Sequence, residues 1–443
     1  MKENTESSPS QGTTVKFQIP YNAPWPTKQE DYPFWSWLQQ LNFNKVEKKK
    51  DGKKIVETDV DHVNVTIEAA EKLIGDSSSY HDYFKNLKNA AADLTRSIHI
   101  IFGYGGAIRE NGLFGSPEEG IKAKKLLPIL GFYHDIGKAI ARPGHPSLGY
   151  RILHDMEPEE REKLENFLRD TTIQINSESF FKIIRYHDVF GVICTGEASL
   201  PMFADIYSAV ADPQESRKIL GLLVLLNIAD LHATLLPDGL TEERVQMMLH
   251  DWDEIDAILQ DPQIHTRADF TEALQRKVSQ PEAAINRIAR LFVAALMRAN
   301  KGKVLVRLHE SPIEEHIKTF FGNRLDDFAR RFAHFCKFDY GLNFFRDIID
   351  CSGIKSAESR ENFAFTSAEI RSAIVPMLKV ISRIVQDYYG LEREAGSRDR
   401  NLIVNMSINP GVSKKLAELL ALRDRDVEAL SWLVDEIGVS VIS

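Results

Sequence analysis

The side chains most able to do chemistry in this sequence are an adjacent histidine and aspartate, His134 and Asp135, in the segment His-Asp-Ile-Gly-Lys. An imidazole nitrogen beside a carboxylate forms a donor pair for metal ions, and the carboxylate can bridge two of them. Suitable donors also occur before and after this pair. The complete candidate set holds four histidines and two aspartates: His62, His134, Asp135, His145, His187 and Asp230. The pattern predicts a metal site.

Three of the candidates fall at the ends of predicted helices. Apolar residues recur at helical spacing through residues 60–74, and His62 lies near the start of this helix. The pair His134-Asp135 ends an apolar helix that begins near Ala123. Lys138 follows Asp135 by three residues and shares its helix face, so its ammonium group can approach an anion held by the metals.

The other three candidates follow a helix stop or lie on buried helix faces. His145 comes directly after Arg142-Pro143-Gly144, where proline disfavours helical geometry in the residue before it. His187 continues the buried face of an apolar segment, and Asp230 continues the apolar stripe of a helix predicted from Arg217 to about Leu235. A carboxylate in an apolar wall is costly unless it is paired or bound to a metal. The alternative for Asp230 is a helix-end carboxylate that reaches solvent.

The ordered series resembles the HD-domain metal-dependent phosphohydrolase superfamily over roughly residues 55 to 240. The resemblance rests on the six candidate ligands and on Gly137-Lys138, which follow the histidine–aspartate pair closely. It implies an all-helical domain whose core helices converge on one or two divalent ions. By position, the first ion would be held by His62, His134, Asp135 and Asp230, and a second by His145 and His187, with Asp135 bridging.

Two features depart from the usual pattern of this superfamily. The gap between His62 and His134 is longer than such domains usually show, and His99 is a rival for the role of first ligand. His62 is preferred because it leads into a long amphipathic helix, whereas His99 lies in the apolar run Ile98–Phe102, which is typical of a core histidine. The residues after His187 are Asp-Val-Phe rather than Gly-Tyr-Pro, which argues against a cyclic di-GMP phosphodiesterase.

The donor set and the resemblance imply a hydrolase that cleaves a phosphate ester of a nucleotide or another small phosphorylated substrate. Imidazole and carboxylate donors suit Mn, Fe, Co, Ni or Zn, and the absence of thiolates from the set argues against structural zinc. One or two such ions would produce a metal-bound hydroxide near neutral pH. Asp135 and Lys138 are the expected catalytic residues, and Lys138, Arg142 and Arg185 are the expected contacts to the substrate phosphate.

Three alternatives use the same residues differently. Similar HD domains with this series cleave DNA or RNA, so an HD-type nuclease is the second hypothesis. A di-iron oxygenase on the same scaffold is the third, although Lys138 favours a phosphate. A non-enzymatic regulator fits less well because every expected ligand is present.

Composition adds bounds rather than a function. The 443-residue chain is 43% apolar and carries a net charge of −9 with a pI near 5.9, so it is not a generic polyanion binder, and a nucleic-acid role would need a local basic groove. Three cysteines, Cys194, Cys336 and Cys351, form neither a disulfide framework nor a zinc motif and favour a reducing compartment. The sequence shows no membrane segment, which predicts a soluble cytoplasmic protein, and a homo-oligomer is compatible with it.

The predicted fold class is mainly α, with a small N-terminal β-hairpin and a helical C-terminal region. Residues 1–15 are expected to be a disordered tail, 16–58 an aromatic-rich segment with a hairpin turn at Asp51-Gly52, 59–240 the HD-type domain, and 241–443 one or two helical domains. Within the last region, Ala283–Ala299 and Ile370–Tyr389 are predicted helices, and Lys301–Leu308 is a candidate strand. The glycine-rich segment Phe102–Gly115, with Arg109, is interpreted as a surface loop or a substrate lid.

Overall fold

The computed structural model describes a chain that is mainly helical, as the sequence predicts. The expected disordered tail, most of the aromatic-rich segment, Asp51-Gly52, Arg142 and the candidate strand Lys301–Leu308 lie outside the described residues. The described residues are 45–50, 53–75, 84, 87, 89–105, 109–141, 144–171, 175–210, 212–234, 240–299, 312–351, 365–389, 401–406 and 438–442.

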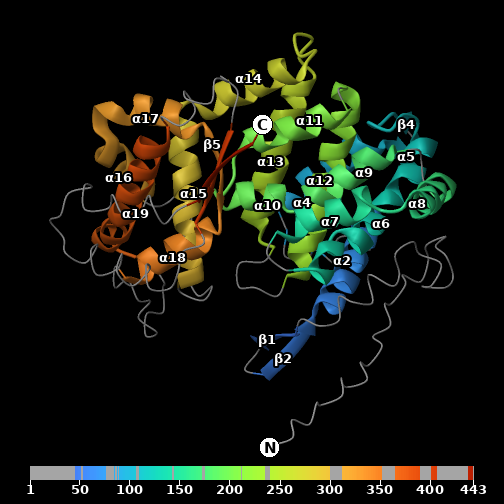
Figure 1. Cartoon of the computed structure of the whole chain (residues 1–443), viewed down its shortest axis with the longest axis horizontal. Helices are drawn as coiled ribbons and strands as arrows, with labels where there is room; N and C mark the ends of the chain where they lie inside the picture. Colours follow the sequence, from blue (N-terminus) through green and yellow to red (C-terminus); the bar gives the residue numbers. More distant parts are fainter. Residues whose placement is uncertain are drawn as a thin grey trace, which may run out of the picture.

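The first described elements are two paired strands that lead into a helix. β1 (Lys45–Lys50) pairs antiparallel with β2 (Lys53–Thr58), with Lys50 opposite Lys53. β2 runs directly into α2 (Asp59–Ile74), whose Val63, Ala70 and Leu73 are buried. Figure 1 shows the strand pair extending away from the helical body, and α2 leads from it into the core.

The first hydrophobic core is built from helices between residues 59 and 278. Its central element is α12 (Pro213–Ala233), in which every residue from Ile219 to Ala229 is buried. A helix that is buried on all sides lies in the middle of its core, so the single apolar stripe predicted for it is too narrow. The elements around it are α4 (Ala90–Phe102), α5 (Pro117–Lys124), α6 (Leu126–Tyr133), η3 (Ile136–Ala139), α7 (His145–His154), α8 (Pro158–Thr171), α9 (Ser177–Arg185), α10 (Val189–Cys194), η4 (Leu200–Phe203), α11 (Ala204–Val210), α13 (Glu242–Leu259) and α14 (Arg267–Val278).

The glycine-rich segment after α4 contains a short strand pair. β3 (Tyr104–Gly105) pairs antiparallel with β4 (Arg109–Glu110). Gly103 has φ +81°, and a Cβ there would lie 2.7 Å from the carbonyl oxygen of Glu110. Glycine is therefore needed at this position for the chain to fold back on the end of α4.

The second hydrophobic core spans residues 284–406 and combines helices with a sheet. The predicted helices Ala283–Ala299 and Ile370–Tyr389 are confirmed as α15 and α19 within a few residues. The three-stranded sheet was not predicted: β5 pairs parallel with β6, and β6 pairs antiparallel with β7. The elements are α15 (Pro281–Ala299), α16 (Ile313–Phe321), η6 (Gly322–Arg324), α17 (Leu325–Phe332), β5 (Phe335–Asp339), α18 (Gly341–Cys351), α19 (Ser367–Tyr388), β6 (Asn401–Asn405) and β7 (Gly438–Ile442).

The two cores meet where the segment Thr195–Ser199, which follows α10, lies along β5 (Figure 1). The amide of Phe338 donates to the carbonyl of Glu197 at 2.7 Å, and the amide of Ser199 donates to the carbonyl of Cys336 at 2.9 Å. The guanidinium of Arg287 donates to the carbonyls of Gly196, Glu197 and Phe335 and packs on two phenylalanine rings. The second core is thus tied by backbone hydrogen bonds to the chain just beyond α10. Among the described helices, none combines the length and apolar character needed to cross a membrane.

Candidate metal centre

The six candidate ligands come from five separate places in the sequence and lie together at one end of α12. On one side, His62 Nε2 lies 2.8 Å from Asp230 Oδ1 and 3.4 Å from His134 Nε2. On the other side, His145 Nε2 lies 3.2 Å from His187 Nε2. We call His62, His134 and Asp230 the first donor group, and His145 and His187 the second donor group.

Asp135 lies between the two donor groups and directs one carboxylate oxygen to each. Its Oδ2 is 3.6 Å from His62 Nε2 and 3.4 Å from His134 Nε2. Its Oδ1 is 3.1 Å from His145 Nε2 and 3.8 Å from His187 Nε2. A carboxylate placed in this way has the geometry of a bridge between two positions rather than that of a ligand at the edge of one.

The position of the His134-Asp135 pair depends on a break in the helix before it. The sequence predicts one helix from near Ala123 to this pair, but the structure has α5 ending at Lys124 and α6 ending at Tyr133. Pro128 accounts for the first break, because its ring clashes with the carbonyl four residues earlier, that of Lys124, and it has no N–H to donate there. The 3-10 helix η3 then follows Asp135, so the pair occupies a bend rather than a continuous helix face.

Close backbone packing brings the second donor group to this bend. A Cβ on Gly137 would lie 1.9 Å from the carbonyl oxygen of His145 and 2.5 Å from the amide of Gly149, so only glycine fits between η3 and α7. His145 is the first residue of α7, with a proline directly after it. His187 lies two residues beyond the end of α9, in a turn, rather than on the helix itself as predicted.

Backbone carbonyls orient two of the imidazole rings. His134 Nδ1 is 2.7 Å from the carbonyl of Gly131, and His187 Nδ1 is 2.8 Å from that of Ile184. Each carbonyl belongs to the last turn of a helix and has no amide partner further along it. The neutral ring therefore carries its proton on Nδ1 and directs the Nε2 lone pair to the centre. In the sequence, the signal for this arrangement is a histidine three residues after a residue in the last turn of a predicted helix. This signal was not used to predict how the rings are oriented.

Burial and charge make this centre electrostatically unusual. Burial lowers the pKa of His187 to about 4, helped by the neighbouring His145 and His134, so its imidazole is neutral at physiological pH. Burial disfavours the Asp135 carboxylate, but His134 and Lys138 outweigh this and hold its pKa well below the usual range. Burial likewise opposes the charge on His62, but the hydrogen bond from its ring to Asp230 outweighs this and raises the His62 pKa.

Lys138 is the predicted phosphate-binding residue that the structure places at the centre. Its ammonium group forms an ion pair with Asp135 Oδ2, and its side chain is only 14% exposed. Burial lowers its pKa, but Asp135, with Asp230 and the buried Asp59 as smaller contributors, raises it above the usual value. The ammonium group therefore stays charged beside the bridging carboxylate.

The other predicted phosphate contacts are placed differently. Arg142 lies outside the described residues. The guanidinium of Arg185 lies 3.5 Å from Asp205 and over the rings of Tyr150 and Tyr186, at 5.2 and 5.4 Å from their centroids. Its charge is balanced by Asp205, and none of its contacts within the described chain is with the six ligands.

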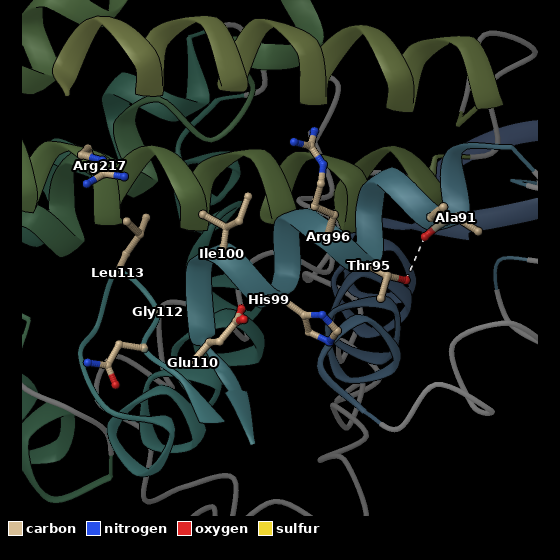
Figure 2. Close-up of a pocket in the computed structure, with 11 residues that line it drawn as sticks. Ala91, Thr95, Arg96, His99, Ile100, Glu110, Gly112, Leu113 and Arg217 are labelled. Carbon is tan, nitrogen blue, oxygen red and sulfur yellow. Dashed lines mark hydrogen bonds between the residues drawn. The ribbon is translucent and has the colours of Figure 1, made fainter. Parts of the chain in front are cut away.

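His99, the rival first ligand, lies elsewhere. Figure 2 shows it on α4, near Glu110, Leu113 and Arg217. These residues line a cavity of about 920 Å³. None of the six candidate ligands lines this cavity. The described part of the glycine-rich segment thus borders a separate hollow, and His62 rather than His99 joins the donor groups.

The donor atoms fit a metal ion by number, type and spacing. Two trios have donor atoms that all lie within 4.8 Å of one another: His62, His134 and Asp230, and His134, Asp135 and His187. Imidazole nitrogens whose lone pairs point at one another repel unless a hydrogen or a cation lies between them. A divalent cation bound between these nitrogens would remove the repulsion. These groups could therefore hold a metal ion. Searches of family models, curated proteins and solved structures gave no significant match to this chain.

Proposed function

We propose that this chain is a metal-dependent phosphohydrolase that cleaves a phosphate ester of a nucleotide or another small phosphorylated substrate. The observation that carries the proposal is the position of Asp135, with one oxygen toward each donor group and Lys138 paired to the same carboxylate. A structural metal site needs no ammonium group at its edge. The Lys138 ammonium group beside the bridging carboxylate of Asp135 instead suits an anionic substrate.

The resemblance to HD-domain phosphohydrolases and the chemistry of the donors support the same reaction class. Divalent ions held by imidazoles and carboxylates lower the pKa of a bound water toward neutrality and neutralise charge on a phosphoryl group. Mn, Fe, Co, Ni or Zn would suit these donors. Asp135 would set the distance between two metal ions. The first donor group would supply the remaining protein ligands of one ion, and the second donor group those of the other.

Lys138 would supply the protein's own charge to the substrate. Its ammonium group lies at the edge of the donor groups and can contact a phosphate oxygen without leaving Asp135. Arg185 would contribute only if the substrate displaced Asp205 from its guanidinium group. We therefore place Lys138 first among the predicted substrate contacts and Arg185 second.

The test is a phosphate-release screen of nucleotides and sugar phosphates with added Mn²⁺, run beside a single-stranded DNA and RNA cleavage assay. Asp135→Asn is the variant expected to be inactive, and Asp251→Asn is the matched control because Asp251 is a buried carboxylate that pairs with Arg290 and belongs to neither donor group. Release from small phosphates that is lost only in Asp135→Asn supports the proposal. Cleavage of polymer alone would favour the nuclease, and two bound irons without hydrolysis would favour the oxygenase.

A further inference from the structure

The short helix α10 begins two residues after His187 and needs a hydrogen-bond acceptor from outside itself. The first amides of any helix have no partner within it. Asp188, at the N-cap position of α10, makes no side-chain capping bond. The amide of Gly191, the third residue of α10, donates to Asn227 Oδ1 at 2.8 Å. Asn227 therefore caps α10 from a different helix.

Asn227 is a polar residue in the most apolar part of the molecule. It lies on α12 within the run Ile219–Ala229 and is only 1% exposed. Burying an amide side chain there is costly unless it is hydrogen-bonded. The neighbouring residues Leu225, Leu226 and Ile228 are aliphatic, so an aliphatic side chain would also suit this position by packing alone. The capping bond to Gly191 satisfies Oδ1 of Asn227, while its buried Nδ2 has no hydrogen-bond partner among the described residues.

The position of Asn227 connects the two donor groups. It precedes Asp230 by three residues on the same helix, so both side chains lie on nearby faces one turn apart. Asp230 belongs to the first donor group, and the turn that α10 follows carries His187 of the second. The hydrogen bond from Gly191 to Asn227 thus links the helix that follows the His187 turn to α12, which carries Asp230.

The other end of α10 is held as well. Thr195–Ser199 is fixed to β5 by the backbone hydrogen bonds of Glu197 and Ser199, and by Arg287. With the far end fixed in this way, the Asn227 bond ties the beginning of α10, which directly follows the His187 turn, to α12.

We propose that Asn227 is a positioning residue that holds the second donor group at the distance from the first that two bridged metal ions require. This inference rests on the proposed metal-dependent function. Residues that orient metal ligands through hydrogen bonds typically change metal affinity by about 10- to 100-fold when they are replaced. We expect Asn227→Leu to weaken the second ion by about that factor and to leave the first ion unchanged.

The experiment is calorimetric titration of Mn²⁺ into the full-length metal-free protein, with stoichiometry checked by mass spectrometry. Asn227→Leu removes the acceptor, and Asn227→Asp keeps an oxygen at the same place. Thr366→Ala is the matched control, because Thr366 caps the distant helix α19 through its side chain. The expected result is that one of the two binding events weakens by about 10- to 100-fold in Asn227→Leu alone, with both events unchanged in Asn227→Asp and Thr366→Ala.

The outcomes separate this inference from the function on which it rests. If the unaltered protein binds no Mn²⁺ or other divalent ion, the proposed function fails. If the unaltered protein binds two ions and Asn227→Leu binds both with unchanged affinity, the positioning role of Asn227 is refuted and the function stands. An equal weakening of both ions in Asn227→Leu and Thr366→Ala would reflect general destabilisation and would also refute the role.

Discussion

Replacing His187 by asparagine should change how the stability of the metal-free protein depends on pH. Asparagine keeps an N–H that can donate to the carbonyl of Ile184, the partner of His187 Nδ1. The substitution removes the imidazole of His187, which is the group that titrates. Burial, with repulsion from His145 and His134, lowers the pKa of His187 from 6.5 to about 4.

The sign of the effect follows from which state binds the proton. Between about pH 4 and 6.5 the unfolded chain protonates His187 while the folded protein keeps it neutral. The unfolded state therefore holds more protons, and the free energy of unfolding rises with pH across this window. The contribution is fully present above pH 6.5 and is lost as the pH falls to about 4. Since one pKa unit is worth about 1.4 kcal/mol, the whole contribution is about 3 kcal/mol.

Urea denaturation in the presence of a chelator, at several pH values from about 4 to 7.5, measures this contribution. The unfolding free energy of the unaltered protein minus that of His187→Asn should be about 3 kcal/mol larger at pH 7.5 than at about pH 4, because only the unaltered protein loses the His187 contribution as the pH falls. His62, whose pKa is raised, contributes with the opposite sign, since its stabilisation is lost as the pH rises. That contribution is present in both proteins and cancels in their difference. Parallel curves would refute the buried, neutral state of His187.

Three further changes test other parts of the structure. Lys138→Ala should lower kcat for phosphate release by about 10-fold or more while metal content stays unchanged, because Lys138 pairs with Asp135 and is not a ligand; loss of metal would contradict this role. His62→Ala should deplete bound metal, whereas His99→Ala should not, because His99 lines the separate cavity of Figure 2; mass spectrometry would show the reverse if His99 were the ligand. Arg287→Met should lower the free energy of unfolding by about 3 kcal/mol, because the buried carbonyls of Gly196 and Phe335 lose their guanidinium donor; a midpoint in urea equal to that of the unaltered protein would disprove it.

Much of the candidate site could be predicted from the sequence because its donors fall at helix boundaries, which leave clear local signals. His145 follows a proline–glycine stop and starts α7, and the six predicted ligands lie together in the fold. The details that orient them could not be predicted. The carbonyls of Gly131 and Ile184, and the cap from Asn227, depend on which helix ends meet in space.

The second core was less predictable than the first. β5, β6 and β7 have only five residues each, and the strands that pair are separated by long stretches of chain, so no local alternation marks them as a sheet. The break between α5 and α6 was missed for another reason. Pro128 lies inside an apolar run whose periodicity looks continuous, and its effect falls four residues earlier, at Lys124.

The measurement that tests the central claim most directly is the metal content of protein purified without chelator, compared between the unaltered chain and Asp135→Ala. Asp135 places one oxygen toward each donor group, so its loss should remove metal from both. We predict about one or two Mn, Fe, Co, Ni or Zn ions per chain in the unaltered protein and a near-complete loss in Asp135→Ala, with Asp251→Asn unchanged. Undiminished metal in Asp135→Ala, or no metal in the unaltered protein, would contradict the assignment of this centre.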